Sequence, residues 1–202
     1  NQTNRLNNSC AKHWTLLADF DAGDIKLVWE ISRFHWLVLA GQAFRAGGSK
    51  NYILLINLWL ADWSKKNPVN QGPNWKCGQE ASIRAINILL AQEMIGSNIF
   101  SQNIIELLMV HIDRITPTTF YAKAQNNNHG ISEGCALLLI GYFLWKNKKA
   151  KKYYSVYQKG LKLVEDQVQK LILDDGTFSQ YSIVYHRMIL DLLSVIELLR
   201  QE

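Results

Sequence analysis

The segment QNNNHGISEG, residues 125–134, places more hydrogen-bonding chemistry at the start of an apolar stretch than any other part of the chain. Its asparagine run favours a turn and a helix N-cap, and the residues that follow, 135–143, are almost all apolar. We therefore predict a buried helix that begins near Asn128. His129 and Glu133 then lie four residues apart on one face, with the Asn128 amide beside them at the helix entrance.

This arrangement has two interpretations. In the first, an imidazole, a carboxylate and an amide meet in a cleft that binds a ligand. In the second, Asn128 only caps the helix, and Glu133 holds a structural histidine.

The composition predicts an all-α fold with a sizeable core. The 202 residues are 48% hydrophobic and 19% charged, which suits a single domain spanning 1–202. Leu, Ile and Ala recur at spacings of three and four, with three prolines and no long alternation of Val, Ile and Thr. The class is therefore all-α.

The net charge of +5 comes largely from a short basic run. Its lysines are Lys146, Lys148, Lys149, Lys151 and Lys152. A helix junction of this kind is either a solvated corner or attractive to a polyanion. No nucleic-acid-binding motif accompanies the charge, so we do not expect a nucleic acid partner.

The three cysteines, Cys10, Cys77 and Cys135, have no CxxC spacing, which argues against a disulfide framework and a structural zinc site. We expect no metal and no cofactor. No apolar run reaches eighteen residues, so we expect no membrane insertion, and residues 1–9 lack a signal-peptide pattern. The chain starts without Met and ends inside an expected helix, so we expect a fragment of a longer protein.

Apolar periodicity and breaker residues predict the order of the helices. The expected helices span residues 24–46, 50–64, 78–95, 101–115, 128–146 and 150–173, with a last one from 183. A long polar loop is expected after Pro117, and a turn at 174–176. Successive helices then form helical hairpins.

Polar residues mark every second helix, about fifty residues apart. The marks are Glu30 and Arg33, Glu80 and Arg84, His129 and Glu133, and Tyr185, His186 and Arg187. Stacked hairpins of this length form either an open solenoid or an incomplete or closed α/α toroid, whose marked helices form the inner ring. The alternative for each acid–arginine pair is an ion pair within one helix.

The same positions carry motifs in a definite order. They are DIK at 24–26 with WEISR at 29–33, NW at 74–75 with EASIR at 80–84, NNH at 127–129 with Glu133, DG at 175–176, YS at 181–182, and YHR at 185–187. Together they cover nearly the whole chain, which resembles the heparinase II/III-like polysaccharide lyases, the family of heparinase-type and alginate lyases.

The resemblance implies an α/α toroid followed by a large β-sandwich domain, with an acidic polysaccharide bound in the cleft between them. That sandwich, which contributes a further histidine to the site, is missing from residues 1–202. The resemblance therefore does not imply that these residues are active by themselves. It also implies a bacterial protein of the periplasm or cell envelope.

A lyase of this kind removes the C5 proton of a uronic acid and expels the oxygen at C4 by β-elimination. The uronate carboxylate must be neutralised by hydrogen-bond donors, and Asn128 and His129 supply an amide and an imidazole for that role. Tyr185 is the candidate for proton transfer, as the acid alone or as both acid and base. These three are the predicted catalytic residues.

The predicted substrate-binding residues surround them. They are Arg33, Asn74, Trp75, Glu80, Arg84, Glu133, Tyr181, His186 and Arg187. Arg33 and Arg84 are expected to face the same cavity and, with His129, to attract a polyanion.

Several of these residues have a second interpretation. Trp75 is either a sugar platform beside Asn74 or a buried anchor between hairpins. His186 and Arg187 either flank the reaction or brace the site from the packing layer. Many family members have Glu-Gln-Ser where this chain has residues 180–182, QYS. Tyr181 there either stacks on a sugar or fills the core.

Three other functions remain open from the residues. His129 and Glu133 have the spacing of metal ligands, but the second histidine of a zinc hydrolase motif is missing. An inverting glycosidase would use Glu80 and Glu133 as its two carboxylates. A non-catalytic glycan-binding module needs neither a metal site nor a pair of catalytic carboxylates. An unsaturated, ultraviolet-absorbing product distinguishes the lyase from all three.

Overall fold

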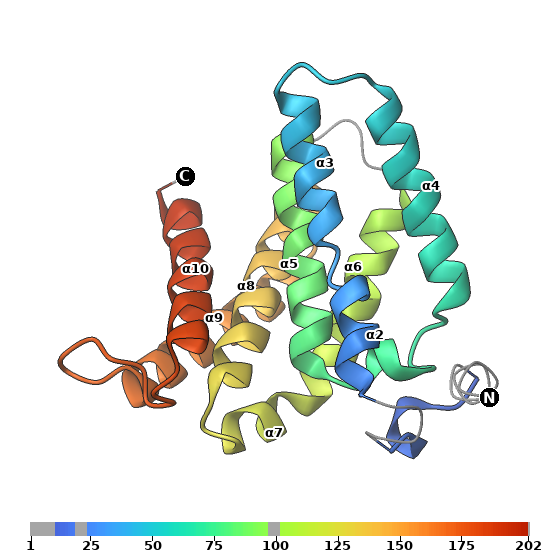
Figure 1. Ribbon diagram of the computed structural model, residues 1–202. Coiled ribbons are helices and arrows are strands. Elements are labelled where there is room, and N and C mark those ends of the chain that lie inside the picture. The colour runs from blue at the N-terminus through green and yellow to red at the C-terminus, as the bar shows by residue number, and fades with distance from the viewer. Residues whose placement is uncertain (1–10, 19–23, 97–101, 202) are drawn as a thin grey trace. The chain divides into compact units, whose positions relative to one another are not determined.

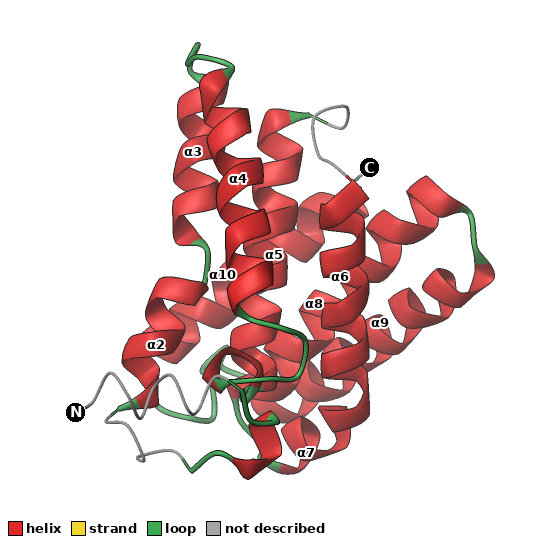
Figure 2. Cartoon of the chain, turned by 90° about the vertical axis from the view of Figure 1, so that its right-hand side faces the viewer, coloured by secondary structure: helices red, strands yellow, loops and turns green. Residues whose placement is uncertain are grey.

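The computed structural model describes residues 11–18, 24–96 and 102–201 (Figure 1). Helices make up almost all of the regular secondary structure in these residues, and loops join the helices (Figure 2). Within that described part, the extended pairings are isolated bridges, His13 with Gln71 and Ile172 with Phe178. The predicted fold class, all-α with helical hairpins of the α/α-toroid type, is confirmed.

Contacts along the chain define two compact units, Asn1–Arg114 and Ile115–Glu202. Each unit has its own buried core. The organisation of residues 1–202 as a single domain stays a prediction.

The first unit is built from two long helices and their partners. Its elements are η1 (Trp14–Leu16), α2 (Ile25–Ser32), α3 (His35–Arg45), α4 (Asn51–Lys66), η2 (Pro73–Trp75), α5 (Gly78–Ile95) and α6 (Gln102–Ile115). α3 packs along α5, and α4 returns beside α3 as the second arm of a hairpin (Figure 1). The predicted bounds of α5 agree with the structure, and α4 and α6 differ by one or two residues.

The prediction of one helix over residues 24–46 is wrong, because the chain breaks between α2 and α3. Phe34 adopts a left-handed conformation with φ 63°, and its side chain is only 1% exposed. Its ring packs edge-on against Trp63. A side chain of α5 forms a hydrogen bond with the backbone at this break: the Asn87 amide donates to Arg33 O at 2.8 Å. Tertiary packing therefore determines the break.

The second unit contains the longest helices. Its elements are η3 (Thr116–Thr118), α7 (Thr119–Ala124), α8 (Asn128–Lys148), α9 (Lys151–Leu171) and α10 (Ile183–Arg200). The predicted starts of α8 and α10 are confirmed, and α9 differs by one or two residues at each end.

The prediction of a long polar loop after Pro117 is wrong, because a 3₁₀ turn and the short helix α7 occupy this stretch of the chain. The Thr118 hydroxyl donates to Ile115 O at 3.2 Å, and the Thr119 hydroxyl donates to Thr116 O at 3.0 Å. The two hydroxyls thus supply donors to carbonyls at the end of α6 and in the 3₁₀ turn, where helical N–H donors run out.

Glycines bring α8 and α9 unusually close. A Cβ at Gly160 would collide with the backbone of Leu138, and one at Gly141 would collide with the backbone of Tyr157. Each glycine therefore sits where two helix backbones touch, and a side chain at either position would force the helices apart. This contact, together with the packing of α10 on α8, forms the core of the second unit.

Candidate functional site

The start of α8 is fixed by its own cap. The Asn127 side chain accepts a hydrogen bond from the His129 N–H at 2.9 Å, so Asn127 is the N-cap. The interpretation of Asn128 as the cap is therefore corrected. Asn128 is the first residue of the helix and is 3% exposed.

A second contact ties this helix start to the segment that leads into α10. The backbone N–H of Asn128 donates to Gln180 Oε1 at 2.9 Å. Two residues later, Ser182 caps α10 by accepting from the Tyr185 N–H at 3.4 Å. The Asn128 end of α8 and the Tyr185 end of α10 are thus linked through residues 180–182.

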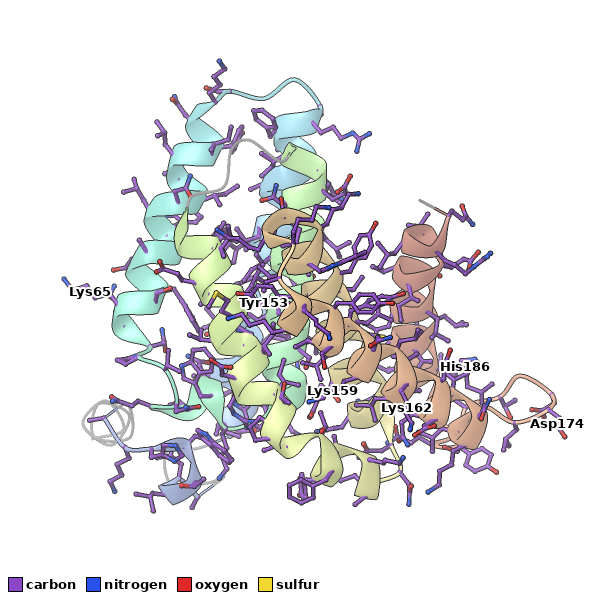
Figure 3. The ribbon with its side chains drawn as sticks, turned by 180° about the vertical axis from the view of Figure 1, so that it is seen from behind. Lys65, Tyr153, Lys159, Lys162, Asp174 and His186 are labelled. Atoms are coloured by element: carbon purple, nitrogen blue, oxygen red, sulfur yellow. The ribbon has the colours of Figure 1, made fainter. Side chains whose placement is uncertain are left out.

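Residues around the first turn of α10 are largely accessible. Tyr185 is 40% exposed and Tyr181 is 85% exposed, with Tyr181 in a left-handed conformation at φ 49°. His186 is half-buried at the start of α10 (Figure 3). Arg187 is exposed and 3.9 Å from Asp191 on the same helix. The two aromatic rings of Tyr181 and Tyr185 are therefore available to a ligand.

Sequence reasoning missed two glutamines in this unit. Gln180 holds the Asn128 N–H, and Gln167 from α9 lies directly against Gly130 in the first turn of α8. Gln167 is fully buried. Gln180 belongs to the QYS stretch at 180–182, but the sequence does not indicate its contact with Asn128, and nothing in the apolar pattern of α9 signals that Gln167 is a buried amide facing a glycine.

In the first unit, Arg33 and Glu80 form a close ion pair between helices. Arg33 Nε and Nη2 donate to the two carboxylate oxygens of Glu80 at 2.7 and 2.8 Å, and Nη1 donates to Glu30 at 2.6 Å. Glu80 is 4% exposed. The hydrogen bonds with Glu80 raise the pKa of Arg33. Glu30 and Arg33 also form the expected ion pair within one stretch of chain.

Arg84 lies inside the first unit. It does not form the ion pair with Glu80 that their spacing of four residues on one helix suggested. It is 1% exposed, and its guanidinium lies 4.6 Å from the ring centre of Trp63 and 5.2 Å from that of Trp75. It donates to Asn74 O at 2.9 Å. Burial lowers its pKa to about 9, which still leaves it charged at neutral pH. We therefore assign Arg84 to the interior and not to a substrate surface.

His111, which sequence reasoning also missed, completes this buried group. Its Nε2 accepts from Arg84 Nε at 3.0 Å, so the proton is on Nδ1, which faces Leu107 O at 2.6 Å. Burial, followed by the charge of Arg84, lowers the pKa of His111 to about 3. The imidazole is neutral and orients the arginine.

Trp75 is a buried anchor, the second of its two interpretations. It is completely buried, and its indole N–H donates to Asn67 O at 3.1 Å. Asn74 is 5% exposed and donates to Asn67 Oδ1 at 2.7 Å. A ring with no exposed face cannot stack on a sugar, so we propose no sugar contact for Trp75.

The described residues contain no cluster of three or more His, Cys, Asp or Glu side chains placed to hold a metal ion. Over the same part of the chain, no helix combines the length and apolar character needed to cross a membrane. Burial raises the pKa of the Cys135 thiol, which is enclosed within α8.

Comparison with known proteins gives one family and one relative. The family model described as "Heparinase II/III N-terminus" matches residues 13–202. A protein named heparin-sulfate lyase, from Bacteroides thetaiotaomicron, is 24% identical over 165 residues, which cover 78% of this chain and 23% of that protein. The chain thus spans less than a quarter of that relative's length. No solved structure matches.

Proposed function

Because this chain belongs to the heparinase II/III family, whose N-terminal model matches residues 13–202, we propose that it is the helical part of a polysaccharide lyase. Its substrate is an acidic polysaccharide that contains uronic acid, and the bond is cleaved by β-elimination. A polypeptide of the same protein beyond residues 1–202, the β-sandwich domain, completes the site.

The observation that carries this proposal is the link between Asn128 and Gln180. It joins the helix entrance that bears Asn128 and His129 to the segment that leads to Tyr185, all within the second unit. Since Asn127 supplies the cap, the start of α8 does not require the Asn128 side chain.

In the proposed reaction, Asn128 and His129 donate hydrogen bonds to the uronate carboxylate. Loss of the C5 proton to a base then places negative charge on that carboxylate, where donors stabilise it most strongly. The electron pair from the C5–H bond forms the C4–C5 double bond, and the C4–O bond breaks. Tyr185 is that base in its phenolate form: it takes the C5 proton, and the phenol O–H so formed then protonates the departing oxygen.

The other candidates have supporting roles in this proposal. Glu133 orients His129 from the next turn, Tyr181 offers an exposed ring to a sugar, and His186 and Arg187 flank Tyr185. In the first unit, Arg33 is half-buried and contributes positive charge, whereas Asn74 and Glu80 are buried, and Glu80 holds Arg33 in place.

The geometry does not favour the glycosidase alternative. Both oxygens of Glu80 already accept hydrogen bonds from Arg33, so neither is directed at a glycosidic bond. A pair of carboxylates flanking one bond would also need Glu80 free to exchange a proton.

The test uses the intact protein that contains this chain, incubated with a panel of acidic polysaccharides. We expect absorbance from an unsaturated product, and we expect Tyr185→Phe to abolish turnover while binding survives, because only the phenolic oxygen is removed. New reducing ends without that absorbance would show a hydrolase. Binding without any cleavage would show a glycan-binding module, and either result overturns the proposal.

A further inference from the structure

Four aromatic side chains lie between α8 and α9, and each of them contacts two of the others. We call them the aromatic quartet: Tyr142, Trp145, Tyr154 and Tyr157. The ring centres of Trp145 and Tyr154 are 5.0 Å apart, and those of Tyr154 and Tyr157 are 5.8 Å apart and stacked. The ring centre of Tyr142 lies 6.1 Å from that of Tyr157 and 6.4 Å from that of Trp145. Tyr154 is 36% exposed and the other three are half-buried, so ring surface remains accessible.

The quartet lies beside the turn between the two helices, where the charge is strongly positive. We call its residues the lysine turn: Lys146, Lys148, Lys149, Lys151 and Lys152, all exposed. No Asp or Glu occurs between Glu133 and Glu165. Among the described residues, no ion pair involves Lys148, Lys149, Lys151 or Lys152.

Ammonium groups of the lysine turn lie over the quartet. Lys146 Nζ is 5.5 Å from the Tyr142 ring centre, and Lys149 Nζ is 5.7 Å from that of Trp145. Lys152 Nζ lies 4.8 Å from the ring of Tyr153, the neighbour of Tyr154. Lys159 and Lys162 continue the basic surface along α9 (Figure 3). Cations and aromatic faces are thus mixed on one surface.

This surface is unfavourable for the protein by itself. Five like charges within seven residues repel one another, and Lys149 adopts the left-handed conformation, φ 54°, at the C-cap where glycine is usual. The hydroxyls of Tyr142, Tyr154 and Tyr157 are not among the buried polar atoms without a partner, so they can bond to water or to a ligand. A ligand that brings negative charge would relieve the repulsion between the lysines.

We propose that the lysine turn and the aromatic quartet form a second binding site for an acidic glycan. The lysines bind carboxylate or sulfate groups, the ring faces pack against the C–H faces of sugars, and the phenol hydroxyls bond to sugar hydroxyls. The assignment of the ligand to acidic glycans rests on the proposed function.

This second site is far from the proposed reaction centre. Asn128 is the first residue of the 21-residue helix α8 and Lys148 is the last, so they lie 20 positions apart, about 30 Å at 1.5 Å per residue. A long polymer that reaches both places gains effective concentration, whereas a short oligosaccharide occupies one at a time. The site therefore holds the polymer between cleavage events.

The test measures binding of the intact protein that contains this chain to heparin, which carries sulfates, and to alginate, which carries only carboxylates. The triple variant Lys148→Gln, Lys149→Gln, Lys151→Gln removes three charges from the lysine turn. The control Lys12→Gln, Lys50→Gln, Lys65→Gln removes three exposed charges from the first unit. We expect the first triple to weaken binding about tenfold and the control to change it less than about twofold.

A second pair of variants tests the rings. Tyr154→Ala should weaken binding roughly fivefold or more through lost stacking, whereas Tyr154→Phe keeps the ring and most of the affinity. Circular dichroism and the melting temperature verify that each variant is folded. If the protein binds neither polymer, if the two triples weaken binding equally, or if Tyr154→Ala binds as the parent does, the site is overturned.

Two competitors test the class of ligand. Single-stranded oligo(dT) and vesicles of anionic phospholipid are offered at matched negative charge. If either displaces the glycan at lower concentration than unlabelled heparin or alginate does, the glycan assignment is overturned. If the intact protein forms no unsaturated product but the triple variant still loses glycan binding, the proposed function fails and this inference stands.

Discussion

Arg33 and Glu80 join two helices through two parallel hydrogen bonds, from Nε and Nη2 to the two carboxylate oxygens. Arg33 sits at the end of α2, directly before the break at Phe34, and Glu80 sits in the first turn of α5. The pair therefore fixes the position of the break against α5. The sequence places Arg33 near Glu30 and Glu80 near Arg84. The structure retains the pair of Arg33 with Glu30 and also joins Arg33 to Glu80, 47 residues away.

Replacing Arg33 by lysine tests this pair. Arg33→Lys keeps the charge but cannot donate two parallel bonds, so we expect the free energy of unfolding to fall by about 1–2 kcal/mol. Arg187→Lys is the control, because Arg187 is exposed and 3.9 Å from Asp191. Urea unfolding measures both. Equal stability of the Arg33 variant and the parent would show that the second hydrogen bond contributes nothing.

The buried His111 predicts how stability depends on pH. Its pKa is lowered to about 3 in the folded chain, so between that value and about 6.5 the unfolded chain binds a proton that the folded chain does not. Stability from this group is present above pH 6.5 and is lost as the pH falls toward 3, by up to about 1.4 kcal/mol per pH unit. Unfolding by urea at several pH values measures this slope.

His111→Gln separates this contribution from that of the carboxylates. A glutamine can still accept from Arg84 and donate to Leu107 O, but it does not titrate, so we expect a shallower loss of stability below pH 6.5. His35→Gln, at an exposed position, serves as the control. A profile for the His111 variant that parallels the parent's would contradict the assignment.

The contact between α8 and α9 predicts a large effect of one methyl group. Gly160→Ala places a Cβ against the Leu138 backbone, which cannot yield as a side chain can, so we expect a loss of about 1–3 kcal/mol. Gln158→Ala, on the exposed side of α9, should be nearly neutral. Thermal unfolding compares the two. A Gly160 variant as stable as the parent would mean that the helices separate at little cost.

Asn127 and Asn128 are expected to separate stability from activity. Asn127→Ala removes the cap of α8 and should cost about 1 kcal/mol of stability. Asn128→Ala should leave the cap intact but lower the rate of cleavage by the intact protein, by about two to three powers of ten if the amide stabilises the developing charge. Both quantities are measured for both variants. Full lyase activity in Asn128→Ala would remove Asn128 from the site.

Helix bounds were predictable where the signal is local. The asparagine run before α8 and Gly96 after α5, with φ 95°, mark helix ends by their own conformational preferences. The break at Phe34 was not predictable, because no residue near it disfavours a helix. It exists because the ring of Phe34 packs against Trp63 and because Asn87 bonds to the freed Arg33 carbonyl.

The sequence could predict which residue types of the candidate site lie at which helical positions. It could not predict which of these residues are exposed. Periodicity identifies which face of α5 carries Arg84, yet it does not reveal that aromatic rings from other elements enclose the guanidinium. The same holds for Trp75, whose surroundings come from residues far away in the sequence. Tyr185 remains a candidate because it is 40% exposed. Asn128 is buried, as Arg84 and Trp75 are, and its role stays a proposal that the Asn128→Ala variant tests.

The acceptor that Gln180 offers to the Asn128 N–H is an uncharged amide oxygen. The backbone dipoles of α8 sum to a partial positive charge at its first turn, and a carboxylate in the position of that amide would neutralise it. This chain satisfies the donor without cancelling the field. The first turn of a 21-residue helix therefore keeps its electrostatic attraction for an anion that arrives from outside the protein.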